Sequence, residues 1–109
     1  MAKARKGAAR IRKLIEEAVV DAYTEDEQEM GFMVGMENDM SFPFTALVVG
    51  EEVEVVGVEM EPGERGIMAV CERNGRQYRV SITSLEWSGK SPRGAEWIKA
   101  YRCWLRGGW

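Results

Sequence analysis

The sequence predicts an α+β domain with two N-terminal helices, a small SH3-like antiparallel β-barrel or meander, and a C-terminal helix. Three observations support this order. An apolar period of 3.6 residues near the start changes to a period of two after Pro43, and Asn74-Gly75 separates two apolar runs as a tight turn would. With 109 residues the chain can bury its own core. We expect one domain over 1–109, with a flexible basic tail over 1–9.

A pair of helices is expected over residues 10–40. In the first helix, apolar residues recur at helical spacing, at Ile11, Leu14, Ile15, Ala18 and Ala22. Thr24 and Glu27 have the spacing of a capping box, so the second helix should begin at Glu25 and end at about Met40. Its methionines should face the core. Its two glycines, which weaken a helix, are best explained by close approach of the first helix.

Short strands and a last helix should follow. Four strands are expected within a barrel over residues 45–87, at 46–49, 52–58, 67–73 and 76–82. Gly57 interrupts the second strand and predicts a bulge or a bend. Ser91 and Pro92 fit the N-cap and first residue of a terminal helix over 91–106.

Charge divides the chain into segments of opposite sign. Between Leu14 and Glu64 there are 15 acidic residues and no basic one, although the net charge is only −3. Six basic residues precede Leu14, and nine basic residues against three acidic ones follow from Arg65 onward. Crowded like charges destabilise a compact fold. They could be offset by the chain's own basic half, by a basic partner or by a bound metal cation.

Composition limits the chemistry. The chain has no His, and Cys71 and Cys103 match no metal or redox spacing, so His-dependent catalysis and zinc sites are excluded. We expect a non-catalytic protein, and any metal site should use oxygen ligands, which favours calcium or magnesium. No apolar run could span a bilayer, and residues 1–13 lack the apolar core of a secretory signal. We expect a cytoplasmic protein, with a transit peptide as the alternative for 1–13.

Acidic residues of the second helix are the first candidates for metal ligands. Glu37, Asn38 and Asp39 lie in its last turn, where the helix dipole disfavours negative charge. A divalent cation would relieve this conflict by binding carboxylate, amide and backbone oxygens together. The alternative is a solvated turn neutralised by arginines. Further candidates lie in the first turns of that helix and around the loop over 60–66, namely Glu25, Asp26, Glu29, Glu59, Glu61 and Glu64.

Other functions predict other partners. No EF-hand loop is present, so a calcium site would be of another type. The alternative function is an SH3-like interaction module whose acidic face binds a basic protein or the basic half of a second copy. The C-terminal arginines and aromatic residues could contact nucleic acid, but we expect a solvated surface over an aromatic core. We expect no membrane partner, and a monomer or a weak homo-oligomer.

Five segments in order resemble the CcbP-type calcium-binding proteins described in cyanobacteria. They span roughly residues 10–85 and read Asp21-Ala22-Tyr23, Met30-Gly31-Phe32, Met36-Glu37-Asn38-Asp39-Met40, Phe42-Pro43-Phe44-Thr45-Ala46 and Val49–Gly57. The resemblance implies a small cytoplasmic protein that binds calcium through surface carboxylates, as a buffer or sensor. In that family a Glu-Asp pair before the Phe-Pro-Phe element is thought to hold metal. It matches Glu37 and Asn38 here, with Asp39 next to replace the missing charge.

Overall fold

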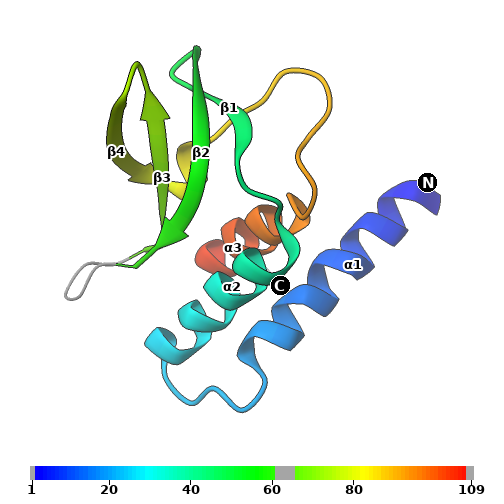
Figure 1. The fold of residues 1–109 in the computed structure, drawn as a ribbon. Helices are drawn as coiled ribbons and strands as arrows, with labels where there is room; N and C mark the ends of the chain where they lie inside the picture. Colours follow the sequence, from blue (N-terminus) through cyan, green and yellow to red (C-terminus); the bar gives the residue numbers. More distant parts are fainter. Residues whose placement is uncertain (1, 61–65, 108–109) are drawn as a thin grey trace.

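The computed structural model describes residues 2–60 and 66–107. Within them the elements are α1 (Ala2–Val19), α2 (Glu25–Asp39), β1 (Phe44–Val48), β2 (Glu51–Glu59), β3 (Met68–Arg73), β4 (Arg76–Ser81), the 3-10 helix η1 (Ile82–Ser84) and α3 (Glu96–Arg106). Figure 1 shows the helices together on one side of the molecule and the sheet on the other. The predicted α+β class and element order are therefore confirmed. No helix in these ranges is long and apolar enough to cross a membrane.

The strands form an open antiparallel meander with the order β1-β2-β3-β4. The register shifts between Val55 and Gly57, which is the irregularity predicted from Gly57. A closed barrel is not found in the described residues, because β1 and β4 are the edges of the sheet. Only an isolated bridge between Leu47 and Glu86 brings the chain back to β1. The helices supply the other layer of the core, so the sheet can bury its apolar face without closing.

The core lies between the sheet and the helices and takes side chains from both layers. Leu14 and Ile15 of α1 are fully buried, as their helical spacing predicted. The expectation that the methionines of α2 face the core is only partly right, since Met36 is buried but Met30 is 44% exposed. Phe32 occupies the centre instead, in contact with the rings of Trp97, Tyr101 and Trp104 from α3.

Two helix starts differ from the sequence expectation. Helix α1 begins at Ala2, so residues 2–9 are helical, whereas a flexible tail was expected over 1–9. Alanine, lysine and arginine favour helix, and here this outweighs positive charge at the positive end of the dipole. Helix α3 begins at Glu96 rather than Ser91. The reason is Gly94, whose φ of +82° is left-handed and interrupts a helix.

Glycines in α2 allow two different helices to approach. A Cβ atom on Gly31 would lie 2.1 Å from the carbonyl oxygen of Ala18, which confirms the predicted close contact with α1. A Cβ atom on Gly35 would lie 2.5 Å from the ring of Trp97. The second glycine therefore makes room for α3, not for α1.

Gly31→Ala is expected to destabilise the protein by about 2 kcal/mol, since the added methyl group must push α1 away. This outweighs the gain of about 1 kcal/mol in helix propensity. Gly7→Ala in α1 is the matched control, because nothing lies within 4 Å of a Cβ atom there. Urea denaturation should give shifts of opposite sign for the two variants. A Gly31→Ala protein stabilised as much as Gly7→Ala would show that the helices can separate at no cost.

Candidate metal site

The predicted ligands lie in three places. Glu25, Asp26 and Glu29 are in the first two turns of α2, and Glu37, Asn38 and Asp39 are in its last turn. Glu59 ends β2, whereas Glu61 and Glu64 lie outside the described residues. Helix α2 has 15 residues, or about 22 Å at 1.5 Å per residue. Its two acidic ends are therefore too far apart to bind one ion together.

The start of α2 is fixed by a capping arrangement. The Oγ1 atom of Thr24 accepts a hydrogen bond from the backbone N–H of Glu27 at 3.1 Å. The Glu27 carboxylate in turn accepts from the N–H of Tyr23 at 3.2 Å, one residue earlier than an ideal capping box. Glu25 and Asp26, in the same turn, are both exposed and add two carboxylates to this end of α2.

A cavity of about 410 Å³ opens where the start of α2 meets α3 and the sheet. It is lined by Glu25, Asp26, Gln28, Glu29, Gly66, Ser81, Tyr101, Trp104 and Leu105. Its lining thus combines three acidic residues with one amide side chain and two hydroxyl groups. A set of hard oxygen donors fits calcium, which takes six to eight oxygens at about 2.3–2.6 Å.

Glu29 is the buried carboxylate of this cavity, with 7% of its surface exposed. Its Oε2 atom accepts a hydrogen bond from the Tyr101 hydroxyl at 2.6 Å. The same hydroxyl oxygen accepts from the backbone N–H of Ile67 at 3.2 Å. Burial and the hydrogen bond to Glu29 raise the pKa of Tyr101, so the hydroxyl keeps the proton that it donates. Tyr101 therefore links α2, α3 and the start of β3 at the cavity wall.

The acidic turn at the other end of α2 does not converge. Glu37, Asn38 and Asp39 are all exposed, and successive residues of a helix point about 100° apart. Asp39 is held in place, because its Oδ2 atom accepts a hydrogen bond from the indole N–H of Trp97 at 2.6 Å. In the described ranges Glu37 and Asp39 form no ion pair with an arginine. An indole, not a guanidinium, thus meets the negative charge here.

Described residues on either side of segment 61–65 have defined positions. Glu59 forms an ion pair with Arg79 of β4, so its carboxylate is already neutralised. Gly66 lines the cavity, and Ile67 donates to Tyr101 beside it. The chain that follows the loop is therefore placed next to the buried carboxylate of Glu29.

The structure brings three of the predicted ligands to one cavity, but not into a tight cluster. Over residues 2–60 and 66–107, no three acidic or cysteine side chains lie close enough to form a ready-made metal site. The spacing of Glu25, Asp26 and Glu29 could have indicated their shared face from sequence, because residues three and four apart are neighbours on a helix. Nothing in the sequence indicated that Tyr101 would hold Glu29.

Comparison with known proteins identifies the family. A family model described as calcium binding, that of CcbP, matches residues 12–105. The chain belongs to the CcbP calcium-binding family. The match continues through most of α3, beyond the roughly 10–85 over which the sequence resemblance was visible. The predicted family and its ion, calcium, are thus confirmed.

Solved structures share the fold. The crystal structure of Anabaena CcbP gives a TM-score of 0.74 at 19% identity, covering 90% of this chain and 89% of that one. A calcium-binding protein in the calcium-binding form gives 0.70 at 22% identity, covering 92% of each chain. No curated protein matches the sequence. At these identities the two structures establish the architecture.

Proposed function

We propose that this CcbP-family protein binds calcium through its carboxylates and acts, without catalysis, as a cytoplasmic calcium buffer or sensor. The observation that carries the proposal is the cavity shared by Glu25, Asp26 and Glu29. Membership of a calcium-binding family supports the ion. The all-oxygen donor set, in a chain without His, supports a hard cation over a transition metal.

Glu25, Asp26 and Glu29 would hold the ion, with the oxygens of Gln28 and Ser81 within the same lining. Bound calcium would supply the positive charge that this acidic segment lacks. Tyr101 would keep the Glu29 carboxylate oriented, as partners behind a ligand do in metal sites. Because the ligands line an open cavity and form no tight cluster, water should complete the coordination, and the affinity should be weak to moderate.

The remaining predicted ligands are proposed in secondary roles. Glu37, Asn38 and Asp39 would form a separate open site at the far end of α2, where a cation also suits the helix dipole. Glu59, Glu61 and Glu64 would assist the cavity from the loop. Glu59 would first have to give up its ion pair with Arg79.

Calcium titration of paired variants tests the proposed ligands. Glu25→Gln with Asp26→Asn should weaken binding at least about tenfold in isothermal titration, or about 1.4 kcal/mol. Glu37→Gln with Asp39→Asn removes the same charge from the other end of α2 and should have a smaller effect on the cavity site. Glu52→Gln with Glu54→Gln, on the exposed face of β2, controls for net charge. If all three pairs bind calcium like the wild type, the proposed ligands are wrong.

The buffer and sensor roles predict different responses. A buffer should show NMR shifts confined to residues that line the cavity. A sensor should also show shifts on the opposite face of α3, at residues such as Lys99 and Cys103, which do not line it. A calcium titration followed by NMR therefore reports the stoichiometry, the location of the site and the conformational response together.

A further inference from the structure

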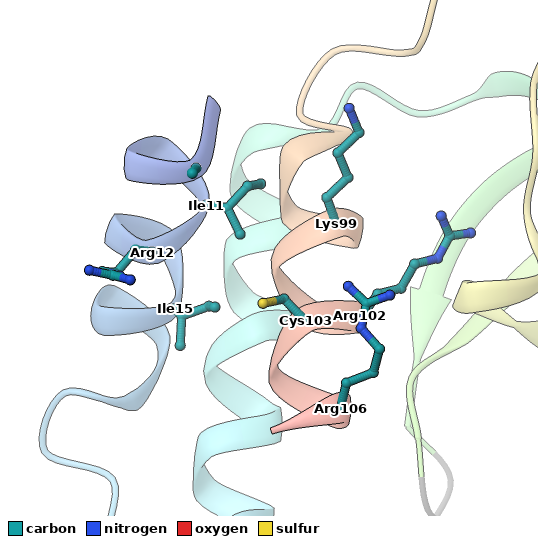
Figure 2. Close-up of a pocket in the computed structure, with 8 residues that line it drawn as sticks. Ile11, Arg12, Ile15, Lys99, Arg102, Cys103 and Arg106 are labelled. Atoms are coloured by element: carbon teal, nitrogen blue, oxygen red, sulfur yellow. The ribbon is translucent and has the colours of Figure 1, made fainter. Parts of the chain in front are cut away.

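Helices α1 and α3 enclose a second hollow, a groove of about 420 Å³. Figure 2 shows Ile11 and Ile15 of α1 on one side of it and Cys103 of α3 pointing toward them from the other. Lys99, Cys103 and Arg106 lie on one face of α3, at intervals of four and three residues. The side chains of α3 that line the acidic cavity are on the opposite face. This groove is thus distinct from the candidate metal site.

Basic side chains border the apolar walls of the groove. Arg12 lies on α1, and Lys99 and Arg106 lie on α3. Among the described residues none of these three forms an ion pair with a carboxylate. Arg102 differs, because its guanidinium donates to the backbone carbonyls of Thr83 and Leu85 at 2.8 and 2.9 Å. It fixes α3 against η1, which leaves the other three cations for a ligand.

The spacing of the cations indicates the shape of that ligand. Lys99 and Arg106 are two helical turns apart, about 10 Å along the axis. One carboxylate or phosphate group would have to draw both long side chains together, whereas carboxylates two turns apart on a helix match this spacing directly. An apolar cavity of about 150 Å³ holds a group the size of benzene. At about 420 Å³, the groove can therefore hold two or three apolar side chains.

We propose that the α1–α3 groove is a docking site for an acidic amphipathic helix of a partner protein. Apolar side chains of the partner would fill the space between Ile11, Ile15 and Cys103. Its flanking carboxylates would pair with Lys99 and Arg106 at the two ends, and with Arg12 on the other wall. Helix-in-groove binding combines an apolar stripe for affinity with flanking charge for specificity and rate. The proposal does not depend on calcium binding.

A designed peptide tests it on the full chain without added calcium. The probe is a labelled helical peptide of about 18 residues, with leucines at helical spacing and glutamates on both sides. Fluorescence anisotropy should show saturable binding that Lys99→Glu with Arg106→Glu weakens at least about tenfold. Arg76→Glu with Lys90→Glu is the matched control, because it changes net charge equally at exposed positions away from the groove. The same peptide with glutamine in place of glutamate should bind at least about tenfold more weakly.

Cys103 provides an independent readout of occupancy. It is partly exposed and lines the groove, whereas Cys71 is fully buried and should not react in the folded protein. Saturating peptide should slow modification of Cys103 by a thiol reagent several-fold. Equal binding by the two charge-reversal variants, equal binding of the glutamine peptide, or an unprotected Cys103 would each overturn the proposal. Self-association of the chain through this groove, seen by sedimentation, would do so as well.

Discussion

Tyr101→Phe is expected to destabilise the protein by about 2–4 kcal/mol. The hydroxyl donates to the buried carboxylate of Glu29 at 2.6 Å and accepts from the N–H of Ile67 at 3.2 Å. Phenylalanine fills almost the same space but leaves a charge and a backbone donor without this partner. Urea denaturation of the two proteins measures the difference directly.

Two further variants separate this effect from general loss of a hydroxyl. Tyr78→Phe changes a half-buried tyrosine of β4 and should alter stability by no more than about 0.5 kcal/mol. In a Glu29→Gln background, Tyr101→Phe should cost less than in the wild type, because no buried charge remains to be satisfied. Equal costs in both backgrounds would show that the carboxylate is solvated from the cavity and does not need Tyr101.

The same substitution should change the alkaline pH dependence of stability. Burial and the Glu29 hydrogen bond raise the pKa of Tyr101 above about 10, the value expected in the unfolded chain. The folded state therefore holds this proton more tightly than the unfolded state does. The resulting stabilisation is fully present below about pH 10 and is lost as the pH rises toward the folded pKa. Denaturation curves of Tyr101→Phe measured above about pH 10 should therefore lack this part of the decline in stability.

Elements set by local sequence were predicted well. Asn74 and Gly75 both have positive φ, at 52° and 75°, as the turn of the β3–β4 hairpin requires. Thr24 is the N-cap of α2, as the capping-box spacing predicted. The β1–β2 turn lies one residue earlier than predicted, because Val49 belongs to the turn, with a φ of 51° that a β-branched residue rarely adopts. The paired residues Val48 and Glu51 flank this turn, a register that the sequence does not display.

Contacts between distant segments explain what sequence could not predict about the site. Glu29 and Tyr101 are 72 positions apart, and Asp39 and Trp97 are 58 apart. Sequence reasoning favoured the end of α2 as the metal site because a helix dipole and an acidic turn are both local features. The structure shows that an indole meets Asp39, and that the buried carboxylate lies at the opposite end of α2. Packing of α3 against α2 causes both differences.

Saturating calcium is expected to stabilise the protein strongly. A ligand that binds only the folded state adds about 2.7 kcal/mol at 100 times its Kd. For a domain of this size that corresponds to a rise of about 10–20 °C in Tm. Thermal unfolding in calcium should be compared with sodium chloride of equal ionic strength, which only screens the acidic segment. Magnesium is the second comparison, since it gives up its water shell reluctantly and suits a wide cavity less well.

Paired variants assign this stabilisation to one end of α2. Carboxylates at the start of a helix interact favourably with its dipole, so Glu25→Gln with Asp26→Asn should slightly lower the Tm of the calcium-free protein. Its weaker calcium binding should also remove at least about half of the calcium response. Glu37→Gln should raise the calcium-free Tm, because negative charge at a helix end is unfavourable, and should leave most of the response intact. A calcium response no larger than that of sodium chloride would mean that the carboxylates are merely screened, and the proposed calcium function would be wrong.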